Sequence, residues 1–116
     1  MNKITRLNLQ YSYVTELPDL SKFTKLSSLN LQGNTAIKNI NIISKINSLE
    51  SLILSYCNMH NKMINFSNLS NLRNLNLSDN LLWSEDLENL KALKNNTNLT
   101  INLDNNSIID ATALLE

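Results

Sequence analysis

One cysteine and one histidine, three residues apart, form the only pair in this chain whose types suit nucleophilic catalysis. Cys57 has the chemistry of a nucleophile and His60 that of its base. The pattern around them argues against this pairing, because Cys57 is predicted to point into the core while His60 lies on the turn that follows. We also identify no third group that would orient the histidine. The sequence therefore predicts that the protein is not an enzyme.

Ligands for a metal ion or a phosphate group are equally sparse. One cysteine and one histidine cannot complete a closed zinc site. The segment from Asp104 to Asp110 has the spaced acids of a calcium loop but lacks its central glycine and closing glutamate. Gly33 is the only glycine, which excludes a glycine-rich phosphate loop. We expect no cofactor and no metal.

The bulk composition limits the class of partner. The chain has 116 residues, is 42% apolar and 17% charged, and carries no formal net charge. A neutral chain of this length predicts one domain, residues 1–116, without the basic excess of a nucleic-acid-binding protein. The sequence holds no apolar run long enough for a signal peptide or a membrane span, so we expect no membrane insertion.

The strongest pattern is an internal repeat. The string Leu-x-x-Leu-x-Leu-x-x-Asn occurs at residues 26–34 and 72–80, with looser copies at residues 4–12, 49–57 and 101–106. This string resembles that of leucine-rich-repeat proteins, and the resemblance covers nearly the whole chain. Successive copies are offset by 22, 23, 23 and 26 residues. The 22-residue form, with apolar residues at every third position, is similar to the bacterial internalin-type repeat and to a phosphatase-regulating repeat of eukaryotes.

The spacing within each repeat predicts its local structure. The Leu-x-Leu pairs have the period of a strand, and the following apolar residues recur every third position, as in 3₁₀ turns or an extended return. We expect five repeats, with strands near residues 5–10, 28–32, 51–55, 74–78 and 100–104. Stacked repeats would bury each other's apolar faces. The resemblance implies an α/β solenoid, a right-handed superhelix with a parallel concave sheet and short helices on the convex side.

Three columns should run through such a stack. Two are apolar, one from Leu7 to Ile101 and one from Leu9 to Leu103. The third occupies the bend after each strand and is expected to satisfy the turn from inside, since an asparagine amide both donates and accepts hydrogen bonds. We call it the bend column; it comprises Ser12, Asn34, Cys57, Asn80 and Asn106.

The fourth repeat is longer and differs from the others. Ser84, followed by two acidic residues, has the pattern of a helix N-cap, and Leu87, Leu90 and Leu93 would share one helix face. We therefore expect a true helix there, ending at Asn95, with Trp83 packed against it.

The outward strand positions are the candidate binding surface. They are polar and rich in amides, except that Ile53 interrupts a row of asparagines and Tyr56 lies beside it. Exposed aromatic residues are typical interface anchors. We expect a protein ligand to contact this face, unless its side chains only solvate a sheet cut from a longer array. The predicted contact residues are Arg6, Asn8, Gln10, Tyr11, Asn30, Gln32, Ser51, Ile53, Ser55, Tyr56, Asn74, Asn76, Asp79, Asn102 and Asp104.

Three functions remain open at this point. The first is a non-enzymatic protein-interaction module, the second a structural spacer in a larger surface protein, and the third a regulatory subunit of an enzyme. Neither end carries a recognisable cap, which favours a fragment of a longer array or end-to-end self-association. The compartment is not readable; an excerpt of a longer bacterial protein would be secreted or at the cell surface, and a whole protein cytoplasmic.

Overall fold

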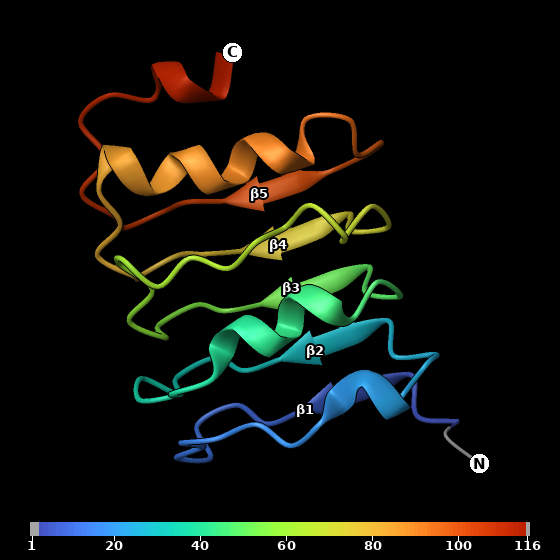
Figure 1. The fold of residues 1–116 in the computed structure, drawn as a ribbon. Coiled ribbons are helices and arrows are strands. Elements are labelled where there is room, and N and C mark those ends of the chain that lie inside the picture. The colour runs from blue at the N-terminus through green and yellow to red at the C-terminus, as the bar shows by residue number, and fades with distance from the viewer. Residues whose placement is uncertain (1–2, 116) are drawn as a thin grey trace.

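The computed structural model describes residues 3–115, which form a stack of five coils measuring 45 × 30 × 18 Å (Figure 1). Residues 1, 2 and 116 of the predicted domain lie outside the described residues. Each coil contributes one strand to a parallel sheet with the order β1-β2-β3-β4-β5. The elements are β1 (Arg6–Asn8), η1 (Leu20–Lys22), β2 (Ser28–Asn30), η2 (Ile40–Lys45), β3 (Ser51–Ile53), β4 (Asn74–Asn76), η3 (Ser84–Leu93), β5 (Thr100–Asn102) and η4 (Thr112–Leu115), where η denotes a 3₁₀ helix.

Coils 1 to 5 are defined here as residues 3–27, 28–50, 51–73, 74–99 and 100–115. The strands are shorter than the predicted spans, but hydrogen bonds between coils continue past them. In coil 1, the Leu9 and Tyr11 N–H groups donate to carbonyls of coil 2 at 2.8 and 2.7 Å. The same two bonds recur at each later junction between coils. The hydrogen bonding between neighbouring coils therefore continues beyond the strands, up to the residue just before each bend.

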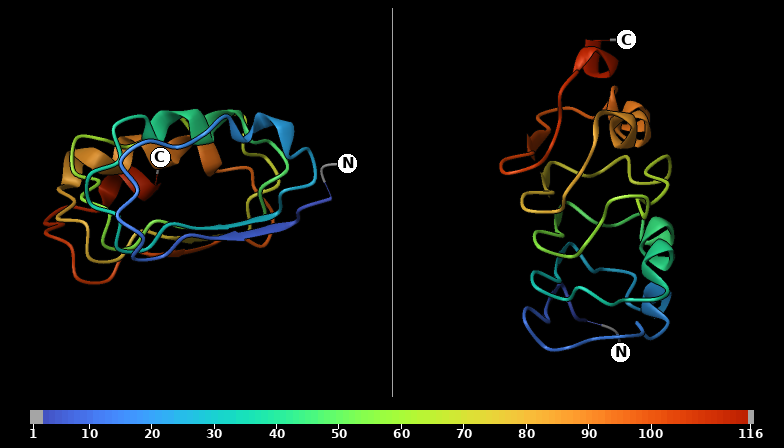
Figure 2. Two further views of the ribbon diagram at one scale, coloured as in Figure 1. Left: turned by 90° about the horizontal axis from the view of Figure 1, so that it is seen from below. Right: turned by 90° about the vertical axis from the view of Figure 1, so that its left-hand side faces the viewer.

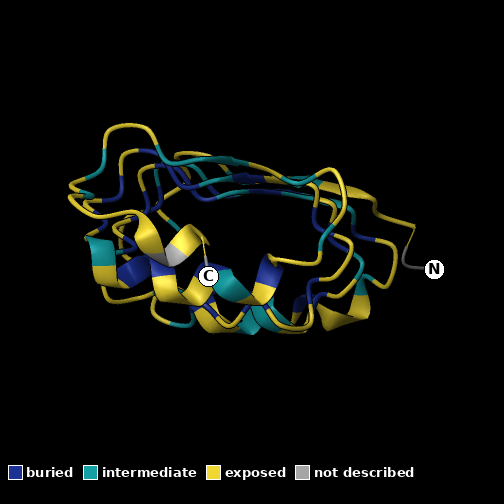
Figure 3. Ribbon diagram, turned by 90° about the horizontal axis from the view of Figure 1, so that it is seen from above, coloured by how far each residue is buried: buried dark blue, intermediate teal, exposed yellow. Residues whose placement is uncertain are grey.

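The first predicted apolar column, from Leu7 to Ile101, is confirmed by the register of the sheet. Leu29, Leu52 and Leu75 pair with one another through the parallel ladders, and Leu7 and Ile101 continue the column at either side. The central members are fully buried, whereas Leu7 and Ile101 are half-buried because each has a neighbouring coil on one side only. Viewed along the stack, the ribbon outlines a flattened tube, and buried residues occur in both of its walls (Figure 3).

The sheet forms one wall of this tube and the return arms form the other (Figure 2). Apolar residues at every third position point inward, as the sequence predicted: Ile40 and Ile43 of η2 are buried, and so is Leu20 of η1. Coil 3 returns without a helix, and its first core position is taken by Ile64, which is fully buried, while Met63 is only half-buried. An extended arm gives up the strict three-residue period, which shifts the inward position by one residue.

The fourth return arm corrects one expectation. Residues Ser84–Leu93 form a ten-residue helix that is 3₁₀, not α, and its N-cap is Trp83. Leu87, Leu90 and Leu93 are all buried, because a spacing of three residues suits a 3₁₀ helix with three residues per turn. The Ser84 hydroxyl does not cap this helix. It accepts the backbone N–H groups of Ile109 and Asp110 at 3.0 and 2.9 Å and so holds coil 5 onto coil 4.

The bend column joins successive coils by hydrogen bonds. Asn80 accepts the backbone N–H groups of Cys57 and Met59, in the preceding coil, through Oδ1 at 2.8 and 3.2 Å. Its Nδ2 donates to the carbonyls of Leu54 and Ser78 at 2.9 and 3.1 Å. Asn34 and Asn106 repeat this arrangement toward coils 1 and 4. Each asparagine thus completes the turn of the coil before it.

Cys57 interrupts this series. Its thiol donates to the carbonyls of Leu31 and Ser55 at 3.1 and 3.5 Å, but sulfur is a weak acceptor and the turn of coil 2 gains no amide oxygen. The Asn34 N–H donates instead to Leu31 of its own coil at 3.2 Å. The junction between coils 2 and 3 therefore lacks the paired bonds found at the other bends of the described chain.

Replacing Cys57 with asparagine is expected to stabilise the protein by about 1 kcal/mol, because the new amide would accept backbone N–H groups of coil 2. Asparagine already fits the corresponding buried position in coils 2 and 4. Chemical denaturation of the wild type, Cys57→Asn and the control Cys57→Ala would measure the effect. A Cys57→Asn protein no more stable than Cys57→Ala would contradict it.

Candidate functional site

The polar residues predicted to bind a ligand do line the outer face of the sheet, but their amides are largely engaged. Asn8, Asn30, Asn76 and Asn102 each accept, through Oδ1, the backbone N–H two residues further along the chain, at 2.9 to 3.1 Å. These local bonds hold the strand exits in shape. The row of asparagines therefore has a structural role that the repeat pattern alone did not indicate.

Two predicted contact residues are less accessible than expected. Ser55 is buried, with only 3% of its surface exposed, so its prediction as an exposed contact residue is wrong. Its small side chain is recessed between the neighbouring coils, as is that of Ser78 on the next coil. Ile53 is half-buried between its ladder partners Asn30 and Asn76 and does not stand above the face.

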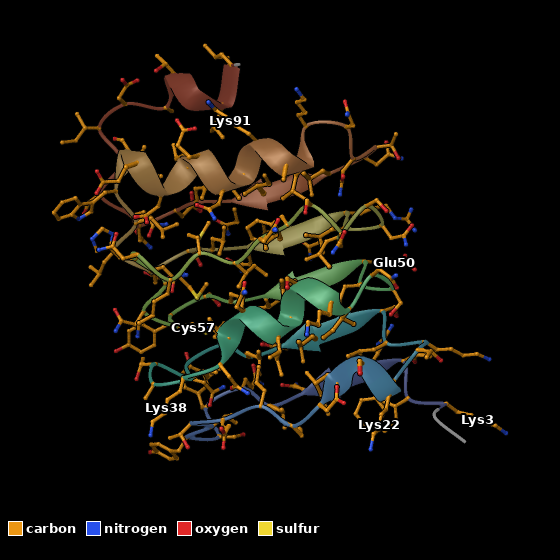
Figure 4. All side chains as sticks on the ribbon, viewed as in Figure 1. Lys3, Lys22, Lys38, Glu50, Cys57 and Lys91 are labelled. Atoms are coloured by element: carbon orange, nitrogen blue, oxygen red, sulfur yellow. The ribbon has the colours of Figure 1, made fainter. Side chains whose placement is uncertain are left out.

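The remaining predicted residues divide between the two ends of the strands. Arg6, Ser51 and Asn74 lie at the strand starts, where the Asn74 amide donates to the Ser51 hydroxyl at 3.3 Å. Gln10, Gln32 and Asp104 lie at the strand exits, together with Tyr11, Tyr56 and Asp79. We call this second side, where each chain bends after its strand, the strand-exit edge. Figure 4 places Cys57 and Lys38 toward this edge and Glu50 at the opposite one.

A left-handed backbone conformation recurs along the strand-exit edge. The residue just before each bend has a positive φ: Tyr11 (52°), Gly33 (82°), Tyr56 (54°), Asp79 (58°) and Asn105 (58°). Only glycine adopts this conformation without steric cost. At Gly33 the Tyr11 ring lies against the backbone, where a Cβ atom would collide with it. The residue just after the bend is also left-handed in three coils, at Tyr13, Asn58 and Leu81.

A pocket of about 410 Å³ opens on this edge across coils 2, 3 and 4. Tyr56 and Leu81 supply its apolar surface and are 55% and 63% exposed. Among the described residues, no side-chain hydrogen bond or ion pair engages the Thr35 hydroxyl, the Asn58 amide or the Asp79 carboxylate. The pocket thus combines apolar surface with polar groups that have no protein partner. Its lining residues are Thr35, Tyr56, Asn58, Asp79, Asn80 and Leu81.

Sequence reasoning identified Tyr56 and Asp79 but missed Thr35, Asn58 and Leu81. The missed residues occupy one position in the repeat, the residue after the bend column, which also holds Tyr13. The available signal was an apolar residue directly after the bend, which singles out Leu81 but neither Thr35 nor Asn58. The predicted surface comprised only strand residues and those before the bend, so residues after the bend were not included in it.

His60 belongs to a second cluster on the same edge, and here the expectation was wrong. A third group does orient the histidine: its Nδ1 lies 2.7 Å from Oδ2 of buried Asp86. The Trp83 ring stacks on the imidazole with ring centroids 4.5 Å apart. His60 Nε2 lies 3.1 Å from the Asn61 amide nitrogen. Neither ring nitrogen is bonded to the Cys57 thiol, which points into the stack as predicted.

Hydrogen bonds dominate the electrostatics of Asp86. Burial raises the pKa of this carboxyl, but the His60 bond and the backbone N–H groups of Trp83 and Asn61 outweigh burial and lower the pKa below 3.8. The two N–H groups donate at 2.8 and 3.0 Å. Burial raises the pKa of the Cys57 thiol, against a smaller opposing effect of nearby backbone N–H groups. Asp86 is therefore an ionised group that ties η3 to coil 3.

Within residues 3–115, no three His, Cys, Asp or Glu side chains group as metal ligands. No helix of the described chain is long and apolar enough to cross a bilayer. No protein-family model matches the sequence, and a search of curated proteins finds no match either.

Proposed function

We propose that this chain is a protein-interaction module of the leucine-rich-repeat type, similar to the bacterial internalin repeats, and that it binds a protein ligand beside its concave sheet. The repeated sequence string and the all-parallel stack of coils support this assignment. A stack of coils presents a long continuous surface, which suits recognition of another macromolecule. The contact region we propose is narrower than the whole face and centres on the strand-exit pocket.

The observation that carries the proposal is Leu81. This leucine is 63% exposed and adopts φ 58°, a conformation that disfavours a residue with a branched apolar side chain. Neither core packing nor backbone preference accounts for leucine at such a position. Strained residues of this kind concentrate at binding sites, where the surrounding structure maintains them. Tyr56, at φ 54° on the adjacent coil, presents its ring at the same pocket.

Leu81→Asn is expected to move stability and binding in opposite directions. Asparagine tolerates the left-handed conformation, so the free energy of unfolding should rise by roughly 0.5–1 kcal/mol. Loss of the apolar contact should reduce binding by at least tenfold, as for a central interface residue. Denaturation would measure the first effect. Capture of proteins on the immobilised chain from extracts of its source organism, quantified by mass spectrometry, would measure the second.

Tyr13→Asn is the matched control, because Tyr13 is also exposed and left-handed but does not line the pocket. It should gain similar stability and retain the captured proteins. Equal capture by wild type and Leu81→Asn would contradict binding at the pocket.

A structural spacer is the second candidate, and one observation favours it. The asparagine row on the sheet face uses its oxygens to stabilise the strand exits, which gives that part of the face a structural role without any ligand. An immobilised wild-type chain that captures no protein would support the spacer over the interaction module.

A further inference from the structure

We propose that the strand-exit pocket receives a lysine or arginine side chain of the partner protein. This inference rests on the proposed function and adds the chemistry of the group recognised. The pocket's six lining residues include one carboxylate, on Asp79, and no cation. A cationic side chain would complement that charge.

The Asp79 carboxylate is available for such a contact. The ion pairs among the described residues involve Asp86, Glu50 and Glu88, and none involves Asp79. The Asp79 backbone is fixed by its N–H bond to the Asp104 carbonyl at 3.0 Å, and its side chain is exposed. A fixed backbone with a free carboxylate provides a defined acceptor for an ammonium or guanidinium group.

The other walls match the remainder of a basic side chain. Lysine and arginine carry long apolar stems below a charged head, and the stems pack on apolar surface while the head stays polar. Leu81 offers that surface, and the exposed Tyr56 ring offers a face that attracts cations. Asn58 and Thr35 supply further oxygens for the N–H groups of the head.

Other occupants fit these walls less well. A wholly apolar side chain would cover the Asp79 carboxylate without replacing the hydrogen bonds it makes to water, which is unfavourable. A phosphate or an acidic side chain would meet like charge. A sugar could use the tyrosine ring and the amide, and it therefore enters the test as a competing ligand.

The test is a titration of the ¹⁵N-labelled chain followed by NMR. The probes are three capped tripeptides in which alanine flanks a central lysine, arginine or norleucine, together with glucose and maltose. The lysine and arginine peptides should produce saturable shifts at the amides of Asn58, Asp79 and Leu81. Norleucine has a similar stem without the charge, and its peptide should bind at least fivefold more weakly.

Asp79→Asn provides the decisive variant, because asparagine keeps the left-handed backbone while removing the charge. It should weaken binding of the lysine and arginine peptides roughly two- to fivefold and leave binding of the norleucine peptide unchanged. Asp104→Asn, which removes an exposed acid outside the pocket, should alter neither.

Three outcomes would overturn the inference: no difference between the lysine and norleucine peptides, no effect of Asp79→Asn, or stronger shifts with the sugars. The capture experiment is independent of this titration. Loss of captured proteins in Leu81→Asn without selectivity for basic peptides would retain the interaction module and reject the basic side chain. Selectivity for basic peptides without any captured protein would retain the cation preference of the pocket and reject a partner protein as the source of the cation.

Discussion

Replacing Asn80 with alanine is expected to lower the free energy of unfolding by about 3–5 kcal/mol, the largest effect predicted for a polar residue here. Asn80 is fully buried and makes four hydrogen bonds, two to N–H groups of coil 3 and two to carbonyls. Alanine would leave the Cys57 and Met59 N–H groups and the Leu54 carbonyl without this partner, whereas the Ser78 carbonyl keeps its bond from the Tyr56 N–H. A typical domain is stable by only about 5–15 kcal/mol, so the variant should be markedly less stable.

Urea denaturation at neutral pH, monitored by circular dichroism, would measure this loss. Asn76→Ala is the matched control, since Asn76 is half-buried and bonds only Ser78, through its N–H and its hydroxyl. It should cost about 1 kcal/mol. Equal losses for the two variants would show that the bend column has no special part in stability.

Asp86→Ala is the second substitution with a large expected effect, about 2–4 kcal/mol of lost stability. The carboxylate accepts hydrogen bonds from the backbone N–H groups of Trp83 and Asn61, and His60 Nδ1 lies beside it. The three nitrogen-to-oxygen distances are all 3.0 Å or less. Its removal would free the start of η3 from coil 3. Trp83 fluorescence offers a local readout, because release of His60 should alter the stacked indole. An unchanged emission spectrum and an unchanged unfolding midpoint would contradict the assignment.

The contribution of Asp86 should also depend on pH in a defined direction. Its pKa is lower in the folded than in the unfolded chain, so folding favours the ionised form. The stabilisation is fully present above the pKa of Asp86 in the unfolded chain, which is about 4. It is lost as the pH falls through the lower pKa of Asp86 in the folded protein. The stability difference between wild type and Asp86→Asn should shrink as the pH falls below about 4. A difference that instead grew in acid would refute this linkage.

Much of the fold followed from spacing alone. A two-residue period fixes which side of a strand is buried, and repeated spacing fixes which residues stack, so Leu29, Leu52 and Leu75 could be aligned by their positions in the repeat. The bend column was equally readable, because an amide that both donates and accepts suits a repeated buried turn. The type of helix in coil 4 could not be predicted, because the capping pattern at Ser84 is compatible with an α-helix and with a 3₁₀ helix. The role of the Ser84 hydroxyl depends on its bonds to coil 5, which the sequence does not show.

The candidate site was predictable only in part. Tyr56 and Asp79 stand out as residues before a bend, but their left-handed backbone depends on hydrogen bonds to the next coil. The pairing of His60 with Asp86 joins residues 26 apart in different coils, which required the offset of the longer fourth repeat. The alternation along its strand places Ser55 outward beside Ile53, so the burial of Ser55 could not be predicted from that pattern.

The direction of the asparagine bonds has a consequence for synthesis on the ribosome. Each bend asparagine satisfies the turn of the coil that emerged before it, so a coil reaches its final hydrogen bonding only after the next one has been made. A nascent chain ending before Asn80 would carry an incomplete third turn, and one ending before Asn106 an incomplete fourth. Coil 2 never receives this closure, since Cys57 follows it. Stalled chains of increasing length should therefore gain protease resistance in steps, with the smallest step as Cys57 leaves the exit tunnel.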